Sequence, residues 1–443
     1  MFNSYEQALE WIHGRLRLGI KPGLKRMEWM LSKLGNPEKK IKTVHIGGTN
    51  GKGSTLTYLR CILQEAGFTV GSFTSPFFEQ FNERISYNGK PISDKEILLL
   101  VNRILPLAEE LEETDLGGPT EFEVITVMAF EYFGHVQPAD LALFEVGLGG
   151  RLDSTNVIEP LLSIITSIGL DHTSILGETY AEIAYEKAGI IKQDTPLITA
   201  VKEESARNVI LQTASKQKAE IYQLGKNLTI QEHSSTAAGE QFSLKTTQNE
   251  YRQLEITMPG EHQVENASLA VMAADLLNLK GFPLEEHHIK QGLARAYWPG
   301  RFEKISEKPL IIVDGAHNNE GMQALTNELQ KRYNNLQKRV IFAALSDKKL
   351  DKMIMQLDSV ADTMTFVDFD FPRAAKASEL IKLSSTHNKK EESDWEKAIS
   401  TEIQSMHDNE MLIITGSLYF LSEVKPFIIK SLNSLNIDVT KSF

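Results

Sequence analysis

The sequence has a single cysteine, Cys61, and no apolar run long enough to cross a membrane. One thiol excludes a disulfide within the chain, which fits a reducing compartment. A membrane span needs roughly 18 or more apolar residues. Residues 1–16 contain acidic side chains and no apolar core of the signal-peptide kind. These features predict a cytoplasmic protein with no membrane partner.

Positive charge is also scarce, because 47 Lys and Arg residues face 59 Asp and Glu residues, a net charge of −12. An acidic chain is a poor candidate for binding nucleic acid as its main task. Hydrophobic residues make up 41% of the chain and charged residues 24%, which is typical of a globular protein. A length of 443 residues predicts two or three domains. A monomer is the default expectation.

Residues 44–58 combine an apolar strand, a glycine-rich turn and the start of a helix. Glycines let backbone N–H groups converge on a phosphate, and the helix N-terminus adds positive potential. Ile46 stands where the usual phosphate-loop pattern has its first glycine, and Gly53 follows the lysine where Ser or Thr is usual. The alternative is a glycine-rich turn that binds nothing. The predicted nucleotide-binding residues are Gly48, Thr49, Asn50, Gly51, Lys52, Gly53, Ser54 and Thr55.

Apolar strands alternate with helical stretches from residue 41 to about residue 200, which predicts an α/β fold with a mostly parallel sheet. Residues 219–258 contain short strand-like pieces, including 220–224, and predict a small antiparallel appendage. A Pro-Gly break at 299–300 precedes a second alternating series. We therefore expect a P-loop-type ATP-binding domain over 1–297 and a smaller Rossmann-like α/β domain over 298–443.

Polar side chains follow several predicted strands, at the sheet edge where α/β proteins bind ligands. Glu145 precedes three glycines, and it is either a magnesium ligand or a solvated strand-end residue. His172 is a candidate metal ligand, although magnesium prefers oxygen. Lys187 ends a predicted helix, where a cation also complements the helix dipole. Residues 314–318 place Asp, His and Asn after a strand, as a site or as a tight turn.

Several segments occur together and in order: GTNGKGST, TSP (74–76), EVGLGGRLDSTN, LDHTSILG, EKAGIIK, PGRFE, DGAHN and TGSLYF. With them the chain resembles the bacterial folylpolyglutamate and dihydrofolate synthases of the Mur-type amide ligase family, over roughly residues 4–430. The resemblance implies that ATP converts a folate carboxylate into an acyl phosphate, which the amine of L-glutamate attacks. The acceptor would be tetrahydrofolate, dihydropteroate or both.

The resemblance also implies roles for individual residues. It assigns magnesium, in two ions, to Ser54, Ser75, Glu145 and His172, and catalysis to Lys52, to Lys187 as a carbamate and to His317. Nucleotide contacts would come from the loop and from Asn266, Arg301 and Asp314, with ATP bound between the domains. The folate and glutamate substrates would meet Thr120, Phe122, Glu123, Leu152, Asp153, Ser154 and Ser417. Phe77 and Phe78 stand where many relatives have His-Leu, so the folate side departs from the family pattern.

Two rival hypotheses remain. A cell-wall Mur ligase with a UDP-sugar substrate uses the same chemistry, but the GKGS loop and residues 145–156 favour the folate branch, and no nucleotide-sugar domain is seen ahead of the loop. A P-loop nucleotide switch belongs to another class, and the sequence lacks an Asn-Lys-x-Asp guanine motif. A switch would hydrolyse nucleotide without folate or glutamate.

Overall fold

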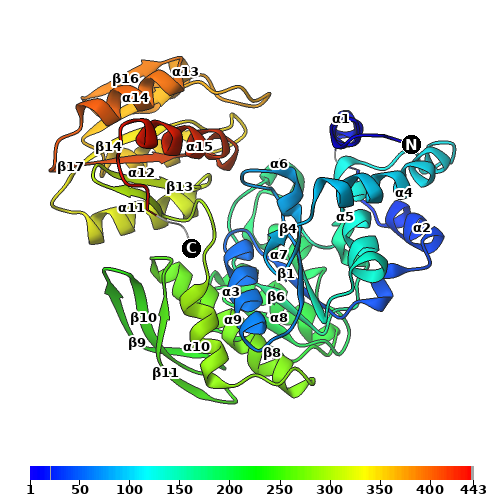
Figure 1. Ribbon diagram of the computed structural model, residues 1–443. Helices are drawn as coiled ribbons and strands as arrows, with labels where there is room; N and C mark the ends of the chain where they lie inside the picture. Colours follow the sequence, from blue (N-terminus) through cyan, green and yellow to red (C-terminus); the bar gives the residue numbers. More distant parts are fainter. Residues whose placement is uncertain (20, 441–443) are drawn as a thin grey trace. The chain divides into compact units, whose positions relative to one another are not determined.

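Strand β1 is fully buried and lies inside an eight-stranded sheet of order β4-β3-β2-β5-β1-β6-β7-β8. The computed structural model describes residues 1–19 and 21–440 (Figure 1). The sheet is parallel except at β3 and β4, which pair antiparallel at one edge. Its strands are β1 (Thr43–Gly47), β2 (Val70–Phe73), β3 (Ile85–Tyr87), β4 (Lys90–Pro91), β5 (Leu141–Glu145), β6 (Leu162–Ile165), β7 (Leu197–Thr199) and β8 (Ile221–Gln223).

Several helices up to Arg295 begin at a residue whose side chain caps the helix. Ser93 and Thr179 each accept a backbone N–H from a glutamate three residues on, whose carboxylate bonds back, so two capping boxes fix the starts of α4 and α7. No helix among the described residues is long and apolar enough to span a membrane. The helices are α1 (Tyr5–His13), α2 (Lys25–Lys33), α3 (Lys52–Glu65), α4 (Asp94–Glu112), α5 (Glu121–Glu131), α6 (Thr173–Leu176), α7 (Tyr180–Ala188), α8 (Glu204–Lys216), α9 (Glu261–Leu279) and α10 (Glu286–Arg295).

Helices cover the large sheet with apolar side chains. Helices α1, α2, α4 and α5 share one core cluster with β2 and β5, built around Phe73, Phe130 and Phe144. Helices α7 and α8 form a second cluster with β6 and β7. Helix α10 packs closely on α3 at Gly292, where a Cβ would lie 2.5 Å from the Ile62 backbone (Figure 1). The predicted helix-covered parallel sheet is thereby confirmed.

The appendage is smaller than the sequence suggested. Strands β9 (Thr229–Thr236), β10 (Gly239–Lys245) and β11 (Glu250–Ile256) form a three-stranded sheet. The prediction that residues 220–224 belong to it was wrong, because β8 pairs in parallel with β7 and extends the large sheet. The three residues of β8 are half-buried or buried, as a strand at the edge of a helix-covered sheet should be.

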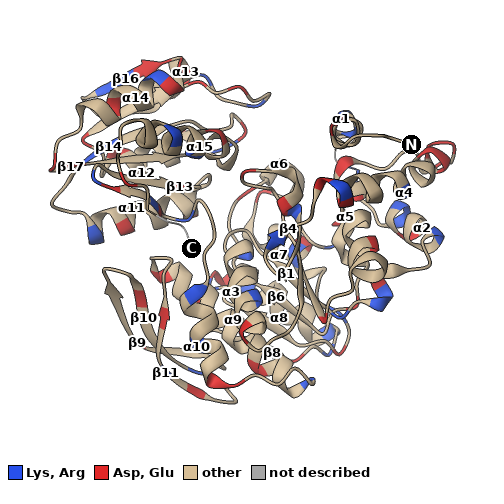
Figure 2. Ribbon diagram, in the orientation of Figure 1, with Lys and Arg blue, Asp and Glu red and all other residues tan. Residues whose placement is uncertain are grey.

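By its contacts the chain forms two compact units. The first comprises residues 1–234, 241–256 and 263–296, and the second comprises 235–240, 257–262 and 297–443. Lys and Arg are interspersed with Asp and Glu along the helices of each unit (Figure 2). The net negative charge is therefore spread over the chain.

The second unit is a smaller α/β layer structure whose sheet has the order β12-β13-β17-β14-β15-β16, parallel except at β12. Helices α11, α12 and α13 pack together, and α14 and α15 pack together. Its elements are β12 (Glu303–Glu307), β13 (Leu310–Asp314), α11 (Asn319–Arg332), β14 (Gln337–Phe342), α12 (Leu350–Asp358), β15 (Thr363–Val367), α13 (Ala377–Leu383), β16 (Lys389–Glu392), α14 (Trp395–Ser405), β17 (Glu410–Thr415) and α15 (Leu418–Ser434).

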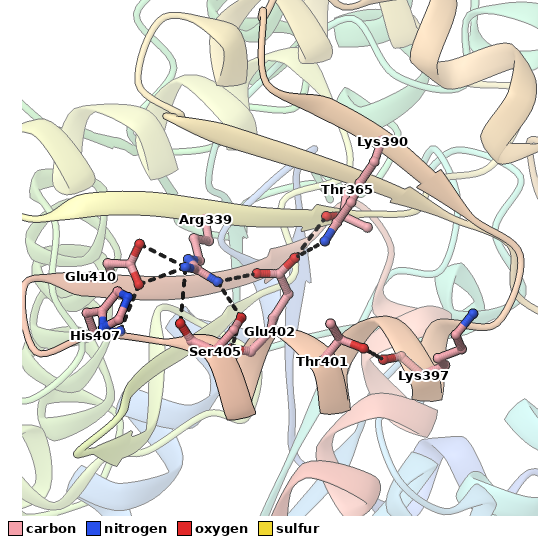
Figure 3. Close-up of polar contacts among 9 residues, drawn as sticks. All are labelled: Arg339, Thr365, Lys390, Lys397, Thr401, Glu402, Ser405, His407 and Glu410. Atoms are coloured by element: carbon pink, nitrogen blue, oxygen red, sulfur yellow. Dashed lines mark hydrogen bonds and ion pairs between the residues drawn. The ribbon is translucent and has the colours of Figure 1, made fainter.

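One ionic network joins α14 to this second sheet (Figure 3). The guanidinium of Arg339 on β14 donates to Glu402 at 2.8 Å and to Glu410 at 2.9 Å, and Lys390 lies 2.7 Å from Glu402. Both glutamates are buried. Each carboxylate therefore has a cationic partner, which a buried charge requires.

Candidate active site

The glycine-rich loop after β1 is joined by hydrogen bonds to the segment that follows β6. Thr49 N donates to Ser167 O at 2.8 Å, and Asn50 N donates to the Ser167 hydroxyl at 3.0 Å. The Thr166 hydroxyl donates to Asn50 O at 2.6 Å. A Cβ at Gly48 would lie 1.9 Å from that same hydroxyl oxygen. The backbone of Gly48 also has φ +142°, so this position of the loop that leads into α3 requires glycine.

Lys52, the first residue of α3, faces the carboxylate of Glu145 at the end of β5. Its Nζ donates to the carbonyls of Gly48 and Thr49, both at 3.2 Å, and lies 3.9 Å from Glu145 Oε1. The backbone N–H of Ser75 donates to Glu145 Oε2 at 3.4 Å. The ends of β1, β2 and β5 thus bring together a lysine, a carboxylate and Ser75.

Lys187 lies on the other side of the same loop. Its side chain is buried at the end of α7, and Nζ donates to Gly48 O at 2.9 Å. Burial, with the nearby Lys52 ammonium adding to it, lowers the pKa of Lys187 to about 7, while Asp171 and Asp153 oppose that shift. A large fraction of this amine is therefore neutral at neutral pH, and a neutral amine is a nucleophile.

His172 caps the short helix α6 with left-handed backbone at φ 51°. Its Nε2 lies 4.0 Å from Asp171 Oδ1, and Asp171 is a charged neighbour of Lys187. Within residues 1–19 and 21–440, no three His, Cys, Asp or Glu side chains group as a metal site. Glu145 presents a carboxylate that the Ser75 N–H contacts, and carboxylate oxygen is the kind of ligand that magnesium prefers.

Helix α9 supplies a residue that the sequence did not single out. Gln263 Nε2 donates to the Ser54 hydroxyl at 3.3 Å, and Asn266 Nδ2 donates to Gln263 Oε1 at 3.2 Å. The Asn266 amide lies against Gly51, where a Cβ would be 2.2 Å from Asn266 Oδ1. The predicted nucleotide residue Asn266 thus meets the phosphate loop, and Gln263 orients Ser54. The first turns of α9 also contain Glu261, His262 and Glu265, so the sequence did not distinguish Gln263.

The predicted folate-side residues of α5 are largely occupied inside the protein. Thr120 caps α5, and Glu123 accepts the Thr120 N–H at 2.7 Å and the Arg26 guanidinium at 2.8 Å. Phe122 is half-buried and lies against Gly147, where a Cβ would be 2.4 Å from its ring. Phe122 therefore packs against the loop that follows Glu145, and the capping box holds the start of α5 in place.

The loop that follows Glu145 is held by Asp153. Its Oδ2 accepts the Leu148 N–H at 2.8 Å, and Oδ1 accepts the N–H and hydroxyl of Thr155. Burial raises the pKa of Asp153, and these hydrogen bonds oppose the shift. Ser154 is buried, whereas Leu152 is 37% exposed. Leu152 is thus the predicted contact in this loop that presents apolar surface.

The four predicted residues of the second unit lie near strand ends: Arg301 precedes β12, Asp314 ends β13, and His317 and Ser417 follow β13 and β17. Asp314 is held by the N–H groups of Phe302 at 2.7 Å and Ala316 at 2.9 Å. Burial raises its pKa, and the Arg301 guanidinium opposes that rise. His317 Nδ1 donates to Gly315 O at 2.8 Å. Ser417 is buried directly after β17.

These features define an α/β protein with a phosphate loop whose lysine faces a carboxylate. The model of the Mur ligase middle domain matches residues 46–274, and that of the Mur ligase glutamate ligase domain matches residues 300–418. The Bacillus subtilis dihydrofolate synthase/folylpolyglutamate synthase is 47% identical over 426 residues, which are 96% of this chain and 99% of that protein. The Lacticaseibacillus casei folylpolyglutamate synthase is 33% identical over 95% of this chain and 98% of its own length.

Solved structures agree over nearly the whole length. The Thermotoga maritima folylpolyglutamate synthase has a TM-score of 0.84 at 33% identity and covers 98% of each chain. An FPGS–AMPPCP–folate complex has a TM-score of 0.85 at 31% identity, covering 96% of this chain and 100% of that chain. The chain therefore belongs to the Mur ligase family, and within it to the folylpolyglutamate and dihydrofolate synthases.

Proposed function

We propose that this protein is an ATP-dependent ligase that adds L-glutamate to the γ-carboxylate of tetrahydrofolate. The observation that carries the proposal is the arrangement of two lysines around the phosphate loop. Lys52 Nζ lies 3.9 Å from Glu145, and the Nζ atoms of Lys52 and Lys187 both donate to the carbonyl oxygen of Gly48. Full-length similarity to enzymes named folylpolyglutamate synthase supplies the substrate class.

The reaction has two balanced steps. A carboxylate oxygen of the folate attacks the γ-phosphorus of ATP, the bond to the β-phosphate oxygen breaks, and ADP leaves with an acyl phosphate formed. The amine of glutamate then attacks the acyl carbon, the C–O bond breaks, and inorganic phosphate leaves as the amine loses a proton. Lys52 offsets the charge that develops on the transferred phosphoryl group.

Magnesium fits the oxygen donors at this edge of the sheet. We propose that Ser54, Ser75, Glu145 and His172 hold it, in two ions, with Glu145 and Ser75 already joined through the Ser75 N–H. Bound magnesium would neutralise phosphate charge and polarise the phosphoryl oxygens.

We further propose that Lys187 carries a carbamate formed from its neutral amine and carbon dioxide. The lowered pKa supports this, because only the unprotonated amine attacks carbon dioxide. The Nζ–carbon bond forms and the amine releases one proton. The new carboxylate would give the second magnesium an oxygen ligand, and Lys52 would pair with its charge.

We also propose roles for the other residues that the family resemblance singles out. Asn266, Arg301 and Asp314 would contact the nucleotide, His317 and Ser417 the incoming glutamate, and Phe122 and Leu152 the folate. Thr120 and Glu123 would position Phe122, since their polar atoms already form hydrogen bonds with each other at the start of α5. We propose that residues 1–297 and 298–443 divide these tasks, and that the enzyme acts as a cytoplasmic monomer.

A second activity, ligation of glutamate to dihydropteroate, is favoured by the Bacillus subtilis relative, whose name joins both activities. Mass spectrometry of products formed with ATP, magnesium and L-glutamate tests both. A glutamyl adduct of tetrahydrofolate supports the main proposal, and an adduct of dihydropteroate adds the second activity. No adduct of either acceptor would refute the folate assignment.

A further inference from the structure

A buried histidine in the central strand of the large sheet has no part in the chemistry described so far. His45 lies in β1, between β5 and β6, and its side chain is fully buried. Its Nε2 lies 2.8 Å from the hydroxyl oxygen of Thr155, which is also fully buried. Val44 and Ile46 point to the opposite face of the strand, and Thr43 and the facing Ser163 of β6 are other buried polar residues on the histidine's side.

The proton positions along this contact follow from which of the three groups can donate a hydrogen bond and which can accept one. The Thr155 hydroxyl donates its one proton to Asp153 Oδ1, so it must accept a proton from His45 Nε2. His45 is then the neutral Nε2–H tautomer. Its Nδ1 has no hydrogen-bond partner in the described part of the chain, which a doubly protonated ring could not tolerate. Burial and the Lys192 charge lower the pKa of His45 to about 3, in agreement.

The far end of this chain of hydrogen bonds is the loop after Glu145. Asp153 binds the Leu148 N–H at 2.8 Å. A Cβ at Gly150 would lie 2.9 Å from Lys187 O, so the loop packs directly on the end of α7. The loop therefore contacts the Phe122 ring at Gly147 and the Lys187 backbone at Gly150, so a change in its conformation would move both.

We propose that His45 is a positioning residue, which acts through Thr155 and Asp153 to hold the loop of residues 146–153 in the shape that receives the folate. In this account Asp153 acts on the folate through the loop and does not contact it. The imidazole is suited to the task because it donates one hydrogen bond without bringing a charge into the core. The kinetic part of the test rests on the proposed ligase function.

The test compares Thr155→Val, which keeps the shape and removes the hydroxyl, with Thr155→Ser, which restores it. Loss of one hydrogen bond to a buried carboxylate is worth roughly tenfold in an equilibrium. We expect Thr155→Val to raise KM for the folate acceptor about tenfold, with KM for ATP unchanged, and Thr155→Ser to return it to about wild type. Thr326→Val removes a buried hydroxyl on α11 and should leave the folate KM unchanged.

A wild-type folate KM in folded Thr155→Val would overturn the proposal, because the hydroxyl would then matter only for stability. If wild-type enzyme has no turnover, the ligase proposal fails and the second measurement decides this one. Long-range ¹H–¹⁵N spectra of histidine-labelled wild-type protein should contain one imidazole that stays Nε2–H and neutral at pH 6, and His45→Gln should lack it. A protonated ring or the Nδ1–H tautomer at His45 would contradict the inference.

Discussion

Replacing Lys187 by methionine is expected to stabilise the fold at acidic pH while it abolishes ligation. Folding lowers the pKa of this amine from 10.5 to about 7. At about 1.4 kcal/mol for each pH unit, the buried ammonium costs about 5 kcal/mol wherever it must be charged. Methionine fills a similar volume without charge, and the lost hydrogen bond to Gly48 O offsets about 1 kcal/mol of the gain.

The sign of the pH dependence follows from the lowered pKa. Between about pH 7 and 10.5 the unfolded wild type binds more protons than the folded wild type, so its stability rises with pH across that window. Below pH 7 the full cost is present. Lys187→Met should therefore be more stable than wild type by about 4 kcal/mol at pH 6.5 and by about 1 kcal/mol at pH 9.

Urea unfolding of both proteins at these two pH values measures the difference. Buffers purged of carbon dioxide keep the wild-type amine free of carbamate. Lys216→Met, at an exposed position on α8, is the control and should change stability little at either pH. Equal destabilisation of Lys187→Met at both pH values would refute the reasoning, since it would mean that the amine is not a buried cation.

Three further outcomes are expected. Lys52→Ala should lose turnover by at least about a hundredfold with the circular dichroism spectrum unchanged; wild-type turnover would remove the phosphate-loop assignment. Gly51→Ala should weaken ATP binding at least about tenfold by calorimetry, because a Cβ at φ +87° would lie 2.2 Å from Asn266 Oδ1; unaltered binding would show that the loop tolerates the shift. Arg339→Ala should cost about 3–5 kcal/mol in urea unfolding, since two buried glutamates lose their shared cation; a change below 1 kcal/mol would mean that water replaces the guanidinium.

Elements with strong local signals could be predicted from the sequence. Helices α4 and α7 carry such signals, because Ser93 and Thr179 begin capping boxes and the apolar positions then recur at helical spacing. The sheet membership of β8 was mispredicted because its three residues carry no information on their partner strand. Strand β16 is all charged, which hides a strand at the exposed edge of a sheet.

The candidate site divides in the same way. Lys52, Glu145 and Lys187 lie within two residues of a glycine at a strand or helix end, and such positions can be recognised in one sequence. Gln263 lies among other polar residues at the start of α9, and His45 lies within a fully buried strand, so neither stands out in the sequence. Each has a partner that is distant in sequence, and only the fold brings the two together.

Activation of a folate carboxylate by phosphorylation can be followed by oxygen labelling. Tetrahydrofolate carrying ¹⁸O in the γ-carboxylate is incubated with the enzyme, ATP, magnesium and L-glutamate, and the inorganic phosphate is analysed by mass spectrometry. We expect one ¹⁸O atom to reach phosphate for each amide formed. Phosphate released without label, or released equally well without folate or glutamate, would contradict it.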